Sequence, residues 1–115
     1  MDTIKQRIIQ ELVPGKQITL AHIIANPDPM LYSSLNADEP PNSAIGVFTI
    51  TPPETAIIIA DIAIKSAGVR PISVDRTSGS LIISGSVSEV EAAARAILGY
   101  VSEKLNFEVC ELTKT

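Results

Sequence analysis

Residues 43–75 read SAIGVFTITPPETAIIIADIAIKSAGVRPISVD, and this stretch predicts a strand, a helix and a second strand. A helix-start signal lies at its centre. Thr51 is the expected N-cap, Pro52 suits the first helical position, and Glu54 is the expected capping-box acid. Gly68 is expected to end the helix in the left-handed conformation. The stretch therefore predicts one complete strand–helix–strand unit.

The predicted helix is apolar around most of its circumference, because only Asp61 and Lys65, one turn apart, interrupt its isoleucines and alanines. One sheet face of a small monomer cannot cover such a helix. The whole chain shows the same excess: 45% of its 115 residues are hydrophobic, 3% are aromatic, and the mean hydropathy is +0.27. Composition therefore predicts a single domain with an aliphatic core that associates with further subunits.

Composition also argues against several classes of function. The net charge of −4 disfavours a nucleic-acid partner, which requires a basic face. No apolar run approaches the roughly 20 residues that span a bilayer, and residues 1–7 begin no secretory signal. We therefore expect a cytoplasmic protein without a membrane partner. Cys110 is the only cysteine, which excludes an intrachain disulfide and a cysteine metal cluster.

The N-terminal part predicts two short strands. Residues 8–13 form the first, and Pro14-Gly15 is a turn signal. Either the two strands form a hairpin, or the first projects as an exposed edge that recruits another chain. Residues 16–25 form the second strand, whose alternation places three side chains on one face: Ile18, Leu20 and His22.

A connector follows these strands. Asn26-Pro27-Asp28-Pro29 ends the second strand, and residues 30–35 predict a short helix. Residues 36–43 are acidic and proline-rich, which is typical of a loop. This loop is expected to join the N-terminal strand and short helix to the main body.

The second half of the chain repeats the central pattern. Residues 76–79 predict a turn, residues 80–85 predict a strand, and Ser86 with Glu89 forms a second capping box. The helix that follows carries apolar residues at helical spacing: Val90, Ala94, Ile97, Val101 and Leu105.

Glu91 and Arg95 are spaced for a weak surface pair on that helix, and residues 107–112 predict a last strand. Residues 44–75 and 80–112 are thus two βαβ units. Such units predict an α+β fold of the ferredoxin-like type, an antiparallel four-stranded sheet with both helices packed on one face. The opposite face, rich in isoleucine, is expected to require a partner.

Side chains for chemistry are scarce. His22 is the only histidine, which excludes a histidine metal pair, and a structural or interface role is expected for it. Cys110 is expected to be a half-buried hydrophobic residue. The loop at residues 75–80 offers hydroxyl groups and backbone N–H groups, although its spacing is also that of a simple β-turn. The glycines form no phosphate-binding motif. We therefore predict no catalytic residue, no metal site and no cofactor.

Four pieces of the sequence, in their order and spacing, resemble one known family; they are residues 8–25, 44–46 with 49–52, 65–67, and 75–76 with 78–79. The chain resembles bacterial microcompartment shell proteins with a BMC domain, of the circularly permuted, single-domain, hexameric type. This type includes the U-type subunit of propanediol-utilisation compartments and the S-type subunit of ethanolamine-utilisation compartments. The resemblance covers nearly the whole chain.

The resemblance implies a single permuted BMC domain over residues 1–115. The strand and short helix at residues 18–35, which normally end the domain, would here precede it. Residues 36–43 would join them to its usual start, and residues 44–115 would form the core. Residues 1–17 would be an N-terminal extension.

The resemblance also implies site residues, because family members form flat or slightly bent cyclic hexamers that tile into a shell. Lys65 and Asn26 would lie at the hexamer edge, although non-permuted relatives carry Arg-Pro-His where this chain has Asn26-Pro27-Asp28. The loop around the central pore would contain Asp75, Arg76, Thr77, Ser78 and Gly79. A small barrel over the pore would contain Ile8, Ile9, Gln10, Glu11, Leu12 and Val13.

The function implied is that of a structural subunit rather than an enzyme. Its partners would be copies of itself, other microcompartment shell proteins and the targeting peptides of encapsulated enzymes, docked on the barrel that caps the pore. Its location would be a microcompartment in the bacterial cytoplasm. Two alternatives remain open on the residues alone: a ferredoxin-like regulatory domain that binds a small ligand, and a small enzyme that uses His22 or Cys110.

Overall fold

The computed structural model describes residues 16–40 and 42–115 of the chain. These residues form five strands and three helices. In chain order they are β1 (Gln17–Ile24), α2 (Pro29–Ser34), β2 (Ala44–Thr51), α3 (Thr55–Ser66), β3 (Arg70–Asp75), β4 (Ser80–Gly85), α4 (Val87–Lys104) and β5 (Thr113–Lys114).

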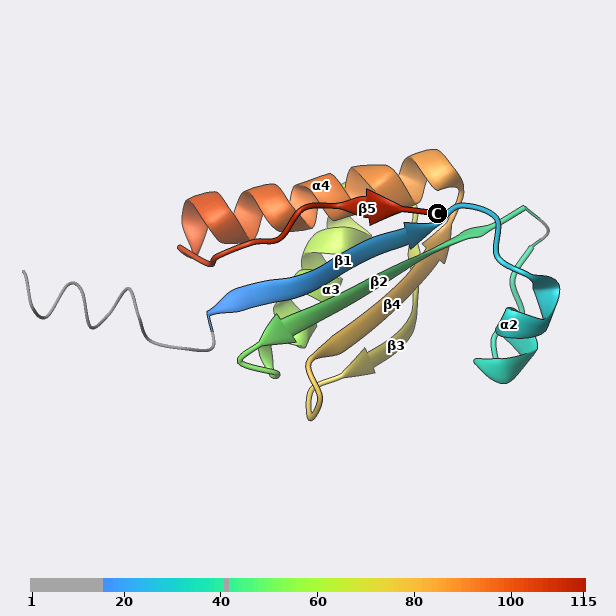
Figure 1. Ribbon diagram of the computed structural model, residues 1–115, viewed down its shortest axis with the longest axis horizontal. Helices are drawn as coiled ribbons and strands as arrows, with labels where there is room; N and C mark the ends of the chain where they lie inside the picture. Colours follow the sequence, from blue (N-terminus) through green and yellow to red (C-terminus); the bar gives the residue numbers. More distant parts are fainter. Residues whose placement is uncertain (1–15, 41) are drawn as a thin grey trace, which may run out of the picture.

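The strands form one open sheet in the order β3-β4-β2-β1-β5, and α3 and α4 lie on the same side of it (Figure 1). Neighbouring strands are antiparallel except β5, which pairs parallel to β1. The predicted α+β class with helices packed on a sheet is confirmed. The sheet has five strands where the two predicted units gave four, because β1, which precedes those units, and β5, at the end of the chain, join the sheet, whereas residues 107–112 form no regular strand.

The core lies between this sheet and the two helices, and it is aliphatic apart from Phe48. The apolar positions predicted on the second helix are buried from Val90 to Val101, and Leu105 packs against the same cluster. Gly46 stands where β2 faces α4, and a Cβ there would lie 3.0 Å from the Val90 side chain. The glycine therefore allows the helix to approach the sheet closely.

The start of α3 differs from the prediction. Thr51 is still the last residue of β2, where it pairs with Gln17, so it does not cap the helix. The helix begins at Thr55 after a turn, and Glu54 at its N-cap makes no side-chain capping bond. The turn is held instead by backbone bonds such as Thr55 N–H to the Pro52 carbonyl, at 3.0 Å. Strand pairing outweighs the local capping signal here.

Gly68 does not end α3 in the left-handed conformation. The helix closes at Ala67 in extended backbone, with φ −155° and ψ 170°, and Gly68 is absent from the positive-φ glycines of the described chain. A Cβ at Gly68 would lie 2.6 Å from the carboxylate of Glu89. The glycine thus leaves room for the capping box of α4. That box is confirmed, since the Ser86 side chain and the Glu89 side chain each bond the other's backbone N–H.

The predicted face of β1 is wrong in part. Ile18 is buried on the helix side, but Leu20 is exposed, because the pairing with β2 shifts register between these two residues. A bulge at this point moves every later side chain to the other face. Ala21 and Ile23 therefore enter the core, and His22 lies on the open face.

The strand predicted at residues 107–112 is also wrong. The chain there runs beside β1 through a single bridge between Glu108 and Gln17, and regular pairing returns only at Thr113 and Lys114. The bulge in β1 lies between these two contacts, so the ladder is interrupted. Phe107, Cys110 and Leu112 still pack against the core. The segment therefore covers the edge of the sheet beside β1, and it contains the half-buried Cys110.

The connector crosses one end of the open face, which is the sheet face opposite α3 and α4. There Ile45 and Ser84 pair across β2 and β4 and are fully buried, although Ile45 is not part of the main core cluster. Glu39, from the acidic linker, accepts a hydrogen bond from Ser84 and forms an ion pair with Arg70. The helix α2, with Asp28 as its N-cap, confirms the short helix predicted at this point.

Candidate functional site

The turn between β3 and β4 contains the predicted pore-loop residues. Asp75 organises it, because its carboxylate accepts the backbone N–H of Thr77 at 2.9 Å and that of Ser78 at 3.2 Å. These bonds favour the charged form and hold the pKa of Asp75 below its ordinary value. Gly79 closes the turn with φ +81°, and its N–H donates to the Asp75 carbonyl at 2.8 Å. The turn is thus a fixed loop of backbone and hydroxyl groups.

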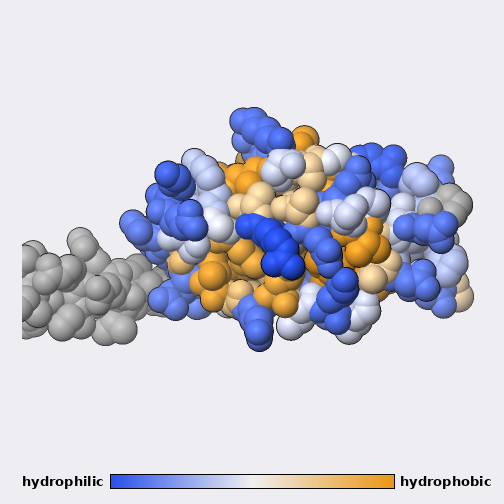
Figure 2. Space-filling view, turned by 90° about the horizontal axis from the view of Figure 1, so that it is seen from above, coloured by the Kyte–Doolittle hydropathy of each residue, from blue (hydrophilic) through white to orange (hydrophobic). Residues whose placement is uncertain are grey.

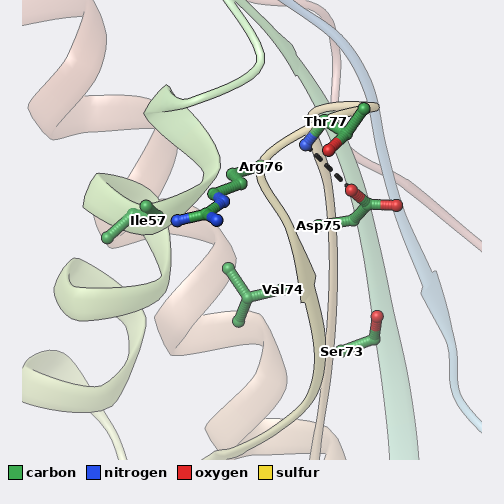
Figure 3. Close-up of a pocket in the computed structure, with 6 residues that line it drawn as sticks. All are labelled: Ile57, Ser73, Val74, Asp75, Arg76 and Thr77. Atoms are coloured by element: carbon green, nitrogen blue, oxygen red, sulfur yellow. Dashed lines mark hydrogen bonds between the residues drawn. The ribbon is translucent and has the colours of Figure 1, made fainter.

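Side chains of this turn point in two directions (Figure 3). Arg76 extends towards α3, where it lies with Val74 and Ile57 along a shallow pocket. Asp75 and Thr77 lie on the other side of β3. The five predicted pore-loop residues therefore share one turn, but Arg76 belongs to the flank of the molecule beside α3.

The strand β1 begins at the same end of the sheet as this turn. Gln17, the first residue of β1, pairs with Thr51 at the end of β2. Ile50, which precedes Thr51 in β2, donates its N–H to the Gly79 carbonyl at 2.8 Å. The start of β1 thus lies about two strand spacings, or roughly 10 Å, from the turn. The predicted barrel residues 8–13 lie outside the described residues. The described sheet itself is open and forms no barrel.

The two predicted hexamer-edge residues lie at the opposite end of the sheet. Asn26 is exposed just after β1 ends, and Lys65 is in the last turn of α3, just before β3 begins. Lys65 pairs with Asp61 at 2.9 Å, and the hydrogen bond to this carboxylate raises the pKa of the lysine. Both positions are therefore free to meet solvent or another subunit at the end distant from the turn.

Apolar side chains also reach the surface. Figure 2, a view onto the α4 side, shows hydrophobic residues gathered between hydrophilic ones. Among the residues that the structure describes, half of the large exposed ones come from α3 and the adjoining strand β3; they are Leu20, Met30, Ile57, Ile58, Ile64, Val74, Tyr100 and Val109. The sequence predicted that α3 would remain partly uncovered, and three isoleucines of this helix are indeed about half exposed.

Two polar groupings in the structure were not predicted from the sequence. One is the contact of Glu39 with Ser84 and Arg70, which joins parts of the chain 31 and 45 residues apart and has no local signal. Near it, the Tyr32 hydroxyl donates to the Ser43 carbonyl at 2.7 Å, and burial together with the Glu39 charge raises the pKa of Tyr32. These contacts hold the linker against the sheet.

The second grouping fixes the last residues to β1 and α4. His22 lies within hydrogen-bonding distance of the hydroxyls of Thr113, at 2.6 Å, and Thr115, at 2.9 Å. Lys114 pairs with Glu91 at 2.7 Å, and this contact lowers the pKa of Glu91 more than Arg95, its predicted partner, does. Both ring nitrogens of His22 are engaged in structural contacts.

Within residues 16–40 and 42–115, no three potential ligands among His, Cys, Asp and Glu are grouped to hold a metal ion. Nor does any helix in these ranges combine the length and apolarity needed to cross a bilayer.

Known proteins share both the sequence and this architecture. Residues 44–111 match the family described as BMC domain. The chain is 48% identical over 111 residues to the bacterial microcompartment shell protein EutS of Escherichia coli (strain K12), covering 96% of this chain and 98% of EutS. It is 50% identical over 109 residues to the shell protein CutR of Streptococcus intermedius, covering 95% and 92%.

Solved structures of microcompartment shell proteins are also similar to this chain. A CutR flat hexamer (form 1) matches with a TM-score of 0.85 at 48% identity, over 90% of this chain and 94% of the CutR chain. A CutR screw (form 1) matches with a TM-score of 0.83 at 47% identity, over 89% and 100%. The chain belongs to the BMC-domain family of bacterial microcompartment shell proteins.

Proposed function

We propose that this chain is a structural, non-catalytic subunit of a bacterial microcompartment shell and that it assembles as a cyclic homo-hexamer. The observation that carries this proposal is the match over almost the whole chain to a CutR subunit that forms a flat hexamer, with 48% identity and a TM-score of 0.85. The half-exposed isoleucines of α3 support association, because a small soluble monomer rarely leaves several large apolar residues on one helix uncovered.

The positions of the predicted sites support one orientation in the ring. The Asp75–Gly79 turn and the start of β1 share one end of the sheet, while Lys65 and Asn26 share the other. The turn would face the central pore, and Lys65 with Asn26 would face neighbouring hexamers and other shell proteins.

The span of the family match and the pairing of β1 support a circularly permuted domain. The BMC match begins at Ala44, although β1, which precedes it, pairs with β2 inside the same sheet. Residues 18–35 would therefore be the permuted strand and short helix, residues 36–43 the linker, and residues 44–115 the core of one domain. Residues 1–17 would be the extension that enters at the pore end.

The extension would cap the pore as a small barrel from residues 8–13 and dock targeting peptides of enzymes enclosed in the compartment. The entry of β1 beside the turn supports this placement, because six such segments would meet near the axis of the ring. Closure into a barrel would also pair the free edges of these short strands.

Light scattering of the purified chain, with and without residues 1–13, tests the proposal. We expect six times the mass of 12.2 kDa for the full chain. A monomer or dimer at every accessible concentration would contradict the hexamer and favour a ligand-binding domain. Electron microscopy then distinguishes flat sheets from curved assemblies.

The truncated chain tests the cap separately. If the hexamer survives truncation while a fluorescent peptide copied from an enzyme of the same compartment loses binding, the extension is a docking cap. Equal binding of the peptide by both forms would rule out the barrel as the docking site. Replacement of both His22 and Cys110 without loss of function would remove the alternative of a small enzyme that uses either residue.

A further inference from the structure

In a cyclic ring each subunit uses two different surfaces to contact its two neighbours. The contact between neighbouring subunits that we infer from this rests on the proposed hexamer. If the β3–β4 turn faces the axis and Lys65 faces the rim, the strands run from the centre outward. The two edges of the sheet, β3 on one side and β1 with the segment 106–115 on the other, then face the neighbouring subunits.

The β3 edge carries an apolar strip that ends in a cation. Val74 is 41% exposed and Ile57 is 51% exposed, and both lie beside Arg76 at the inner end of this edge (Figure 3). Ile64 is seven residues beyond Ile57 on α3, so it continues the strip towards the rim on the same helix face. This flank therefore offers a hydrophobic surface with a guanidinium near the axis.

The opposite edge carries an apolar residue beside anions. Val109 is 39% exposed, and Glu108 and Glu111 on either side of it are exposed. Glu108 is at the inner end, because it bridges to Gln17, the first residue of β1. Lys16 lies over the Phe107 ring, with its ammonium group 6.0 Å from the ring centroid.

The outer parts of both edges have their charges paired within the chain. Arg70, at the start of β3, pairs with Glu39, and Lys114, in β5, pairs with Glu91. At the inner parts of the two edges, a charged side chain of one subunit is therefore available to pair with a charged side chain of the next. By strand register, Asp75 is level with Thr49 of β2 and Glu108 is level with Thr51, so Arg76 and Glu108 lie about one residue apart in depth, and they carry opposite charge.

We propose that the β3 edge of one subunit packs against the 106–111 segment of a second copy, with Arg76 of one chain paired to Glu108 of the next. Val74 and Ile57 would cover Val109 across this contact. The pair would lie close to the pore and would be partly shielded from water by these apolar neighbours. An ion pair in such a place does more than a fully exposed one to fix how two subunits align.

Charge reversal tests the pair. Arg76→Glu and Glu108→Arg are expected to raise the concentration at which the hexamer dissociates by about tenfold or more, as measured by native mass spectrometry. The double variant, which restores opposite charges, is expected to recover most of the wild-type hexamer. Arg95→Glu is the control for the same change of charge, because this exposed residue of α4 belongs to neither β3 nor the 106–111 segment and should leave the mass unchanged.

The outcomes separate this inference from the proposed function. The Arg76–Glu108 contact is overturned, while the hexamer stands, if both single variants dissociate at the same concentration as the wild type. It is also overturned if the double variant dissociates at a concentration as high as either single variant does. A wild-type chain that never forms a hexamer overturns both. Circular dichroism confirms that the variants fold, and Arg76→Gln with Glu108→Gln provides a milder pair if a reversal prevents folding.

Discussion

The amide of Ile50 donates a hydrogen bond to the carbonyl of Gly79 at 2.8 Å, which joins the β3–β4 turn to the last residues of β2. Gly79 has φ +81°, and a Cβ at this position would lie far inside contact distance of the Ile50 carbonyl oxygen. The turn and the end of β2 therefore pack backbone against backbone. The proposed pore loop is held by main-chain contacts that only glycine permits.

Gly79→Ala is expected to destabilise the fold by about 2 kcal/mol or more, because alanine is strained at this φ and its Cβ collides with backbone. Urea denaturation measures the change. Gly99→Ala is the control, since nothing lies within 4 Å of a Cβ there and the position is inside α4. That substitution should stabilise the chain by up to about 1 kcal/mol. Equal effects at the two positions would contradict the packing described for Gly79.

Asp75→Asn is expected to lower the melting temperature at neutral pH, because the amide oxygen is a weaker acceptor for the N–H groups of Thr77 and Ser78. Since folding lowers the pKa of Asp75, its ionised form stabilises the fold above the ordinary carboxyl value of about 3.9. That contribution is lost as the pH falls through the lowered pKa.

Thermal melts of wild type and Asp75→Asn between pH 2 and pH 7 should therefore converge at the acidic end. Asp38→Asn, an exposed linker residue, should not change the melting temperature in this pattern. A constant difference between wild type and Asp75→Asn across the range would show that the charge of Asp75 does not hold the turn.

Glu39→Ala is expected to cost roughly 1–3 kcal/mol, because it leaves the buried Ser84 hydroxyl without its carboxylate acceptor and releases the linker from Arg70. The Glu39 side chain is only 9% exposed, so water replaces these contacts poorly. Chemical denaturation measures the loss, with the neighbouring Asp38→Ala as control. If both variants unfold at the same denaturant concentration as wild type, the linker is not fastened by Glu39.

His22→Ala is expected to loosen the end of the chain without altering the centre of the sheet. It removes the contacts to Thr113 and Thr115, so the Thr115 amide, which bonds the Ile23 carbonyl at 2.9 Å, should exchange faster with deuterium. Amides in the β1–β2 ladder should keep their protection. Thr49→Ala, on the same face of β2, is the control, and equal exchange at Thr115 in both variants would contradict the role assigned to His22.

Signals that act over a few residues were readable from the sequence. The capping box of Ser86 and Glu89 formed as predicted, because both partners belong to the same turn of helix and no strand competes for them. The turn at Asp75–Gly79 was readable for the same reason. At Thr51 an equally good capping signal failed, since that residue is needed at the end of β2. Local rules predict structure where tertiary pairing makes no other demand.

Features that depend on distant partners could not be predicted. The bulge after Ile18 arises from pairing with β2 and reverses the faces of β1. The parallel pairing of the last residues with β1 joins positions more than 90 residues apart. Glu39 was noticed only as part of an acidic loop, and its burial depends on where that loop crosses the sheet. The site residues named from the resemblance stay predictions until the assembly is measured.

The β3 edge has a consequence for the chain before it assembles. An exposed sheet edge offers unpaired backbone groups on which other chains can add strands and aggregate. Pro71 lacks an N–H, and the pairing of β3 with β4 shifts register between Pro71 and Ser73. Both features make a strand a poor template for further strands. A newly made subunit is thereby protected from uncontrolled fibre-like association, and side chains rather than backbone pairing decide which neighbour it accepts.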